Sequence, residues 1–350
     1  MEQQQRDVCV IGAGSWGTAL ATVLADNFPA VHMWARRPEL AREINEKHEN
    51  VRYLPGVVLP SRIVCMDSLA EALKDKTFIL LVVPSHAMRE TVRAMAPFLR
   101  EDAIIAHATK GIEIDTLKRM SEVIKEELPV ALRSRVAVVS GPSHAEEVGL
   151  KSPTTVVAAA DDLSIAEQVQ DILMTSLFRV YTNPDVVGVE IGGSLKNIIA
   201  LAAGLSDGLG FGDNVKAALL TRGLAEIGRL GIVSGANPLT FSGLAGLGDL
   251  VVTATSRHSR NWRAGQMIAQ GLTVSEILQK MGMVVEGIKT TQAVYKIAKE
   301  RNVEMPITRE LYSVLFEGKS AREAVGDLMG RVRRHEMEEV AIDYFSSHGK

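Results

Sequence analysis

The first half of the chain alternates short apolar runs with longer amphipathic stretches, and no other feature limits the fold as strongly. The apolar runs are rich in β-branched residues and almost free of charge, which is typical of parallel strands buried on both faces of a sheet. Strands are predicted at residues 8–11, 31–34, 63–66, 78–83, 104–108 and 136–139, and helices at 18–26, 38–48, 86–99 and 116–127. This order of elements predicts an α/β fold with a doubly wound, mainly parallel sheet.

The second half has a different pattern, in which strand-like runs almost disappear. A last pair of strands at 154–159 and 178–182, with a helix at 165–174 between them, is expected to extend the sheet. Helical patterns then follow at 194–205, 214–230, 263–270, 273–281, 287–299, 306–316 and 320–330. We therefore expect two domains, one over residues 1–188 and an all-helical one over 189–345, joined near 184–190.

A glycine-rich turn follows the first predicted strand and leads directly into the first helix. Its residues are Gly12-Ala13-Gly14-Ser15-Trp16-Gly17. In this context Gly12 permits a tight turn, Gly14 lets a diphosphate approach the backbone, and Gly17 lets the helix pack closely on the strand. The helix N-terminus attracts the negative charge of the diphosphate. The alternative is a purely structural glycine turn, but the position of the motif favours a Rossmann-type dinucleotide-binding domain.

The end of the second predicted strand indicates which dinucleotide is preferred. An acidic residue at this position would bind the ribose 2′-hydroxyl of NAD, but the strand instead ends in Ala35-Arg36-Arg37. Two guanidinium groups suit the 2′-phosphate of NADP, although they could also be a solvated charge pair. We expect NADP as the preferred cofactor and keep NAD as an alternative.

Composition excludes several other classes of protein. Lys and Arg total 39 and Asp and Glu total 42, so the charge balance gives no reason to expect a nucleic-acid partner or an anionic membrane surface. Cys9 and Cys65 both lie in predicted strands, which argues against a disulfide framework. The N-terminus lacks the apolar core of a signal peptide, and no run of about 18 residues is apolar and uncharged. We expect a cytoplasmic protein without a membrane span.

Several polar motifs together resemble one family of enzymes. The motifs are Ala-Thr-Lys-Gly at 108–111, Ser-Gly-Pro-Ser at 140–143, Gly-Ser-Leu-Lys-Asn-Ile-Ile-Ala at 193–200, Gly-Leu-Gly-Asp-Leu at 246–250 and Val-Val-Glu-Gly at 284–287. In this order they resemble the glycerol-3-phosphate dehydrogenase family, and its bacterial NAD(P)-dependent members most closely. The resemblance implies reversible reduction of dihydroxyacetone phosphate to sn-glycerol 3-phosphate, which feeds glycerophospholipid synthesis. The family commonly forms dimers, so a homodimer is considered.

The same resemblance implies roles for individual residues. Lys196 matches the catalytic lysine, the general acid of the reduction and the general base of the reverse reaction. Lys110 is expected beside it as a second cation that contacts substrate and cofactor, and Asp249 is expected to orient Lys196 and balance the charge. Further substrate contacts are implied for Gly141, Ser143, Asn197, Thr253, Ser259, Arg260 and Asn261, with the fork of Arg260 suited to a phosphate. Cofactor contacts are implied for Ser15, Trp16, Ala145, Arg260, Val284 and Glu286.

Other interpretations remain open at this point. A related β-hydroxyacid or 6-phosphogluconate-type dehydrogenase would share the Rossmann domain, the helical domain and a catalytic lysine. A non-catalytic NADP-binding sensor could keep the glycine-rich turn, although two retained lysines argue against it. His144 and His258 are treated as bystanders. His32, His48, His86 and His107 have no carboxylate or cysteine at metal-ligand spacing, so no metal site is predicted.

Overall fold

The computed structural model describes residues 7–333, and its contacts divide the chain into two compact units. Unit 1 consists of Met1–Lys110 and Lys118–Val186, and unit 2 of Gly111–Leu117 and Val187–Lys350. The short segment 111–117 thus belongs to the helical unit, although it lies in the first half of the chain. The predicted domain boundaries, 1–188 and 189–345, stay a prediction, and residues 334–345 lie outside the described part.

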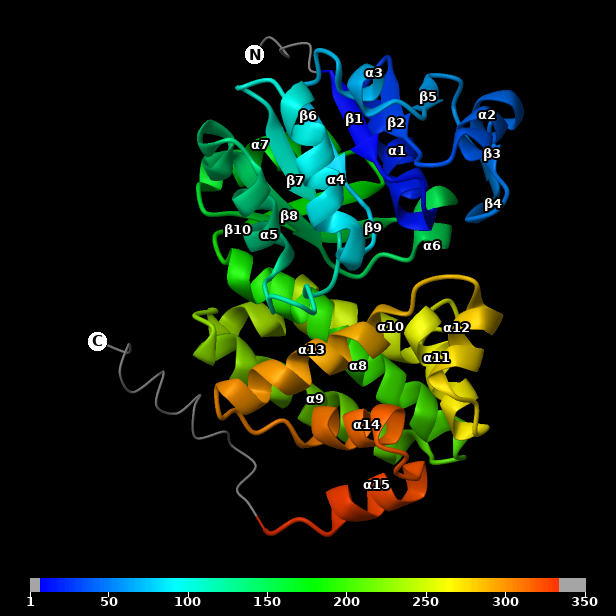
Figure 1. Cartoon of the computed structure of the whole chain (residues 1–350), viewed down its shortest axis with the longest axis vertical. Helices are drawn as coiled ribbons and strands as arrows, with labels where there is room; N and C mark the ends of the chain where they lie inside the picture. Colours follow the sequence, from blue (N-terminus) through cyan, green and yellow to red (C-terminus); the bar gives the residue numbers. More distant parts are fainter. Residues whose placement is uncertain (1–6, 334–350) are drawn as a thin grey trace. The chain divides into compact units, whose positions relative to one another are not determined.

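Unit 1 is built on an eight-stranded sheet with the order β10-β9-β8-β7-β6-β1-β2-β5 (Figure 1). The strands are β1 (Val8–Ile11), β2 (Val31–Trp34), β5 (Ile63–Met66), β6 (Phe78–Leu81), β7 (Ile104–His107), β8 (Val136–Ser140), β9 (Thr154–Ala160) and β10 (Phe178–Asn183). Strands β8, β7, β6, β1, β2 and β5 are parallel to one another, whereas β9 joins β8 in the antiparallel direction and β10 runs parallel to β9. The expectation of a mainly parallel, doubly wound sheet is confirmed.

Both faces of this sheet are covered by helices, which explains why strands such as β1 and β6 are apolar at every position. In β1, Val8 and Val10 belong to one core cluster, and Cys9 and Ile11 belong to another on the opposite face. The first cluster includes side chains of α1 (Ser15–Asn27), α2 (Pro38–Lys47), α6 (Ala145–Gly149) and α7 (Leu163–Leu173). The second includes side chains of α3 (Leu69–Leu73), α4 (Met88–Met95) and α5 (Met120–Glu127).

The strand order places the candidate loops of unit 1 along one edge of the sheet. Strand β1 lies between β2 and β6, so the chain direction across the sheet reverses at β1. In open α/β sheets ligands bind beyond the carboxyl ends of the strands at such a reversal. The turns after β1, β2, β7 and β8 all begin at that edge because these strands are parallel.

Unit 2 is all-helical in its main elements and packs around α8 (Val186–Gly208). The other helices are α9 (Asp213–Val233), α10 (Asp249–Thr255), α11 (Arg260–Ala269), α12 (Val274–Met281), α13 (Glu286–Glu300), α14 (Pro306–Phe316) and α15 (Ala321–Met329). In length and mean hydropathy α8 meets the criteria for a membrane span, but 89% of its apolar window is buried inside the protein. The side chains of Leu195, Ile199 and Leu201 place α8 in the core of unit 2.

Two local features differ from the prediction. The helix expected at 194–205 begins at Val186, and it therefore includes Gly192 and Gly193, which have low helix propensity. A Cβ atom on Gly192 would lie 2.5 Å from the carbonyl oxygen of Ala245, so tight packing requires a glycine inside this helix. The chain also forms a small antiparallel pair, β3 (Glu49–Asn50) with β4 (Leu54–Val58), that the sequence pattern did not indicate.

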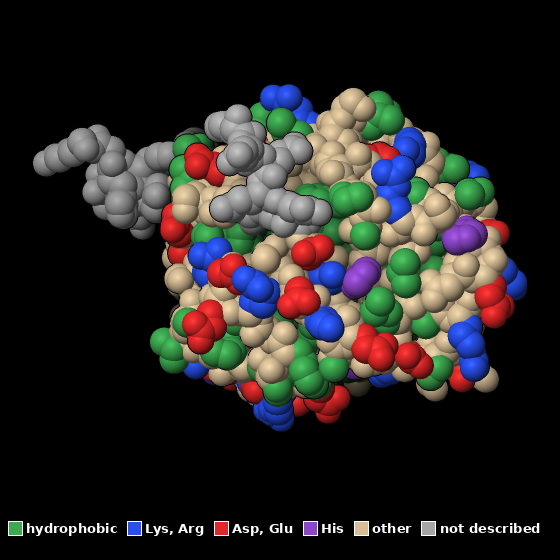
Figure 2. All heavy atoms as spheres, turned by 90° about the horizontal axis from the view of Figure 1, so that it is seen from above, with side chains coloured by type: hydrophobic (Ala, Val, Ile, Leu, Met, Phe, Trp, Pro, Cys, Tyr) green, Lys and Arg blue, Asp and Glu red, His purple; other side chains and the backbone are tan. Residues whose placement is uncertain are grey.

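The charged side chains on the surface are of both signs, and the two cysteines are free thiols. On the face that Figure 2 shows, acidic and basic side chains are interspersed. Cys9 and Cys65 are both free and buried, and burial raises the pKa of the Cys65 thiol to about 12. Neither thiol is therefore suited to act as a nucleophile.

A buried carboxylate on α9 holds the N-terminus of α14. Glu226 is 1% exposed and accepts hydrogen bonds from the backbone N–H of Ile307 and from the N–H and hydroxyl of Thr308. The first N–H groups of a helix have no acceptor within the helix, so Glu226 supplies one from a distant segment. Burial nevertheless raises the pKa of Glu226 from 4.5 to about 7, because desolvation outweighs the opposing effect of these hydrogen bonds.

The raised pKa of Glu226 predicts that its contribution to stability falls as the pH increases. The folded protein binds the proton more tightly than the unfolded chain, so stability is lost as the pH rises from about 4.5 to above 7. Relative to Glu226→Gln, which stays neutral, the wild type is expected to lose roughly 3 kcal/mol over this range. Urea unfolding of both proteins at several values from pH 5 to pH 8 measures the difference. Glu323→Gln is the control, since Glu323 is exposed and its hydrogen bonds to Ser320 lower its pKa. Parallel curves for wild type and Glu226→Gln would contradict the prediction.

Candidate active site

The glycine-rich turn of unit 1 has the geometry that a dinucleotide requires. Gly12 adopts a φ of 120°, and a Cβ atom there would lie 2.7 Å from the carbonyl oxygen of Val82. A Cβ atom on Gly17 would lie 1.9 Å from the carbonyl oxygen of Gly12, so both glycines are needed for close packing. A Cβ atom on Gly14, by contrast, would have no described atom within 4 Å, apart from atoms of the adjacent residues and of the backbone of its own helix. Gly14 is also the N-cap of α1, which opens the N–H groups of the first turn to an anion. The turn therefore fits a diphosphate, with Ser15 and Trp16 in that first turn.

The end of β2 forms a cluster of positive charge around one tyrosine. Arg36 is exposed, and Arg37 is the N-cap of α2. An Nη2 atom of Arg37 donates to the hydroxyl of Tyr53 at 3.0 Å, and its guanidinium lies 5.7 Å from the ring centre. Arg52 lies 5.5 Å from the same ring centre, so Tyr53 has guanidinium groups at two positions. Arg52 and Tyr53 were not predicted from the sequence, because neither belongs to a motif.

The loops after β7 and β8 meet within unit 1. Lys110 follows β7, and its Nζ donates to the carbonyl oxygen of Gly141 at 3.2 Å. Ser143 donates its hydroxyl to the same oxygen at 2.9 Å. Ala145 is the first residue of α6. The structure thus brings together Lys110, Gly141 and Ser143, which the resemblance placed at the substrate.

A buried ion pair forms the centre of the candidate site in unit 2. Lys196 on α8 donates from Nζ to Oδ1 of Asp249 at 2.5 Å and to Oγ1 of Thr253 at 2.6 Å. Both Asp249 and Thr253 lie on α10, one turn apart, so a single short helix presents them together. The Lys196 side chain is 7% exposed and that of Asp249 1%. A charged lysine at such a depth requires a paired carboxylate, because an unpaired buried charge is very costly.

The local sequence explains how α10 reaches Lys196. The π-helical turn Leu244–Gly248 leads directly into Asp249, the first residue of α10. At Gly192, one turn before Lys196, the backbone of α8 lies so close to Ala245 that a side chain would collide with its carbonyl oxygen. This close contact lies directly before the Gly-Leu-Gly-Asp-Leu motif, which supplies the carboxylate of Asp249.

The remaining predicted residues of unit 2 surround the N-termini of two helices. Ser259 is the N-cap of α11, accepting from the N–H of Trp262, and Arg260 and Asn261 occupy its first turn. Arg260 donates from Nη1 to the carbonyl oxygen of Val284 at 3.4 Å, and Glu286 is the first residue of α13. Asn197, next to Lys196 on α8, accepts from Nδ2 of Asn261 at 2.8 Å. Substrate-related and cofactor-related predictions are thus neighbours in this unit.

The comparisons with known proteins agree with this geometry. The family model described as the N-terminus of NAD-dependent glycerol-3-phosphate dehydrogenase matches residues 7–166, and the corresponding C-terminal model matches 185–326. A glycerol-3-phosphate dehydrogenase [NAD(P)+] from Bacillus cereus is 61% identical over 333 residues, covering 95% of this chain and 98% of its own length. The chain belongs to the NAD-dependent glycerol-3-phosphate dehydrogenase family.

Solved structures of this dehydrogenase family have the same fold. The crystal structure of glycerol-3-phosphate dehydrogenase from Coxiella burnetii matches with a TM-score of 0.88 and 40% identity, covering 93% of this chain and 99% of that one. The enzyme from Plasmodium falciparum matches with a TM-score of 0.84 and 25% identity, covering 94% and 97%. Family membership excludes the alternative of a β-hydroxyacid or 6-phosphogluconate-type dehydrogenase.

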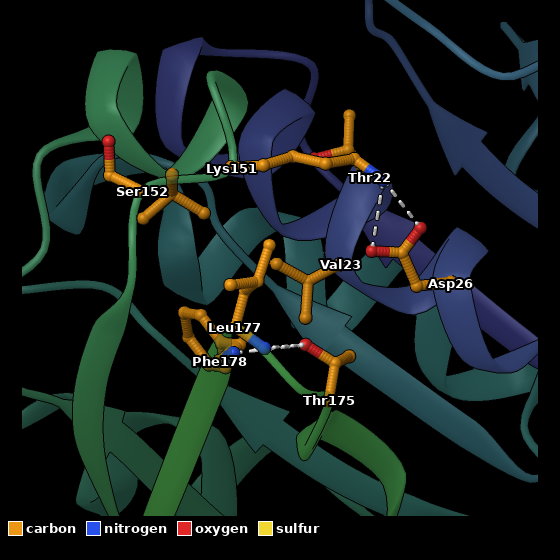
Figure 3. Close-up of a pocket in the computed structure, with 9 residues that line it drawn as sticks. Thr22, Val23, Asp26, Lys151, Ser152, Thr175, Leu177 and Phe178 are labelled. Atoms are coloured by element: carbon orange, nitrogen blue, oxygen red, sulfur yellow. Dashed lines mark hydrogen bonds and ion pairs between the residues drawn. The ribbon is translucent and has the colours of Figure 1, made fainter.

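Other features of the described residues do not form a second candidate for the dehydrogenase site. Among residues 7–333, no group of His, Cys, Asp and Glu could hold a metal ion. A small pocket of unit 1 lies among the end of α1, the segment after α6 and the start of β10 (Figure 3). Lys151 donates to Asp26 across it at 2.9 Å, and its volume of about 20 Å³ has room for about one water molecule. None of the predicted site residues lines this pocket.

Proposed function

We propose that the chain catalyses the reversible reduction of dihydroxyacetone phosphate to sn-glycerol 3-phosphate and prefers NADPH to NADH. The chain is an NAD(P)-dependent oxidoreductase of the glycerol-3-phosphate dehydrogenase family. The observation that carries the proposal is the buried Lys196–Asp249 pair, because reduction of a ketone requires a proton donor in a water-poor site. The relatives named above support the choice of substrate, because they are glycerol-3-phosphate dehydrogenases by name.

The proton is assigned to Lys196. The ammonium group can donate a hydrogen bond to the carbonyl oxygen of the substrate. It can then transfer its proton to the alkoxide that develops on this oxygen. Asp249 compensates the charge of this ammonium, and Thr253 restricts its direction, so the donor is oriented before the substrate binds. In the oxidation of sn-glycerol 3-phosphate the neutral amine takes the proton back. The reduced nicotinamide cofactor supplies the hydride when it is bound.

The substrate phosphate is assigned to the N-terminus of α11. Arg260 offers a planar guanidinium, and Ser259 and Asn261 belong to the same turn, whose N–H groups favour an anion. Lys110, Gly141 and Ser143 are assigned to substrate contacts from unit 1, where they already touch one another. The cofactor is assigned to the turn from Gly12 to Gly17 and, on the family pattern, to Lys110, Ala145, Arg260, Val284 and Glu286.

A direct assay tests the function. Purified protein is mixed with dihydroxyacetone phosphate, and the oxidation of NADPH and of NADH is followed in parallel. Turnover with NADPH, faster than with NADH, is the expected result. Binding of NADPH without turnover of any ketone would instead favour the sensor, and faster turnover with NADH would contradict the cofactor preference.

The arginines after β2 predict a selective effect on NADPH. Replacing Arg36 and Arg37 by alanine removes the charges assigned to the 2′-phosphate, and a charge-assisted hydrogen bond contributes about 1.5–3 kcal/mol. We expect kcat/KM for NADPH to fall roughly 10- to 100-fold and that for NADH to change about twofold or less. Arg42→Ala, an exposed arginine on α2, is the matched control. Equal losses with both cofactors would remove Arg36 and Arg37 from 2′-phosphate recognition.

The cellular setting is also proposed. The free, buried cysteines and the metabolic relatives support a reducing cytoplasm. There the product, sn-glycerol 3-phosphate, would feed glycerophospholipid synthesis. A homodimer is proposed on the family resemblance, and a size measurement in solution tests it.

A further inference from the structure

The side chain of Asn261 connects two helices of unit 2 at the candidate site. Its Nδ2 donates to Oδ1 of Asn197 on α8 at 2.8 Å, and its Oδ1 accepts from the backbone N–H of Gly287 on α13 at 2.8 Å. Asn261 is 7% exposed and Asn197 5%. Both polar ends of the Asn261 amide are therefore used inside the protein, so this amide is poorly placed to be a substrate ligand itself.

The chemistry of these groups gives the chain of hydrogen bonds one direction. A backbone N–H can only donate, so Gly287 must face the oxygen of Asn261. The nitrogen of Asn261 then faces Asn197 and must find an acceptor there, which is Oδ1. The amide of Asn197 consequently has its oxygen directed toward Asn261 and its nitrogen directed away from it.

Close packing keeps the starting point of this chain in place. Gly287 lies in the first turn of α13, where a backbone N–H has no acceptor within its own helix. A Cβ atom on Gly287 would lie 2.6 Å from the carbonyl oxygen of Asn197 and 2.8 Å from Oδ1 of Asn261. Only glycine allows α13 to approach α8 so closely, and the N–H of Gly287 is held against the Asn261 amide as a result.

We propose that Asn261 is a positioning residue that turns the Asn197 amide so that it offers N–H donors, next to Lys196, to an oxygen of the substrate. The inference rests on the proposed function for the identity of that substrate, dihydroxyacetone phosphate. Asn197 touches the substrate, and the side chain of Asn261 acts through Asn197, whereas the backbone N–H groups of its turn stay assigned to the phosphate. We call this chain of hydrogen bonds, from Gly287 through Asn261 to Asn197, the relay. Gly287 sets its direction, and it lies in the segment that the family pattern assigns to the cofactor.

The substitution Asn261→Asp reverses the relay with little change of shape. The carboxylate still accepts from the N–H of Gly287, but it has no proton to donate to Asn197. Asn197 must then turn its nitrogen toward the carboxylate and present its oxygen to the substrate. We expect kcat/KM for dihydroxyacetone phosphate to fall about 10- to 100-fold, while KM for NADPH changes about twofold or less.

A double-mutant cycle distinguishes positioning from direct contact. Wild type, Asn261→Asp, Asn197→Ala and the double variant are compared in the same assay, and Asn261→Leu repeats the cycle without an added charge. In the Asn197→Ala background, a change at position 261 is expected to have little further effect. An undiminished loss in that background would show that Asn261 binds the substrate itself and would overturn the proposal.

Thermal unfolding of the same proteins keeps this result separate from the proposed function. The hydrogen bond between Asn197 and Asn261 predicts coupled changes of Tm whichever substrate the enzyme uses. Additive changes of Tm would overturn the relay. Coupled changes of Tm in a wild-type protein that does not turn over dihydroxyacetone phosphate would support the relay and contradict the proposed function.

Discussion

Replacing Lys196 by alanine is expected to lower kcat for the reduction of dihydroxyacetone phosphate by about 10²- to 10⁴-fold. The expectation follows from the position of Nζ, which is buried on α8 and oriented by Asp249 and Thr253. Alanine removes the proton donor, and the hydroxyl of Thr253, which accepts from Nζ in the wild type, is a much weaker acid than an ammonium group. Steady-state kinetics with NADPH measure the loss.

A matched control separates this chemical effect from a general loss of lysine charge. Lys296 is an exposed lysine on α13 of the same unit, and Lys296→Ala is expected to leave kcat almost unchanged. NADPH binding by Lys196→Ala, followed by fluorescence titration, should stay close to that of the wild type. A decrease in kcat of less than tenfold would remove Lys196 from proton transfer.

The strands of unit 1 could be predicted closely because each strand leaves its signal in a few consecutive residues. Strands β1, β2 and β5 occupy the residues expected from their apolar runs, since burial on both faces leaves a clear signal in the sequence. The β3–β4 pair was missed, because β3 has only two residues and β4 contains Pro55 and Gly56. These two residue types usually indicate a turn, and tertiary packing overrides them here.

The candidate site could be predicted only in part. The glycine-rich turn is recognisable because its three glycines act within one strand, turn and helix. Lys196 and Asp249 are 53 residues apart, and only the family resemblance placed them together. The bond from Gly287 to Asn261 and the guanidinium groups around Tyr53 were beyond prediction, because each depends on how separate segments approach one another. The spacing of residues along the chain does not determine such distances in space.

Removing Asp249 alone is expected to destabilise the protein strongly. Asp249→Ala leaves the ammonium of Lys196 buried without its carboxylate, and breaking a buried pair in this way costs about 3–5 kcal/mol. With roughly 2–4 °C per kcal/mol for a unit of this size, Tm should fall by about 10 °C. Thermal unfolding followed by circular dichroism measures the change. Asp213→Ala is the control, since Asp213 is fully exposed and lies 4.0 Å from Lys216, and it should leave Tm nearly unchanged.

Replacing both partners of the pair is expected to have the opposite effect on stability. In Lys196→Met with Asp249→Leu, no charge remains to be desolvated, and apolar replacements of buried ion pairs are often neutral or stabilising by about 1–4 kcal/mol. The double variant should therefore recover the Tm of the wild type or exceed it, while kcat stays as low as in Lys196→Ala. Such a result would mean that the pair is kept for proton transfer at a cost in stability. A double variant as unstable as Asp249→Ala would show instead that the pair is needed for folding, and Thr253, left beside two apolar groups, would then be the first residue to replace.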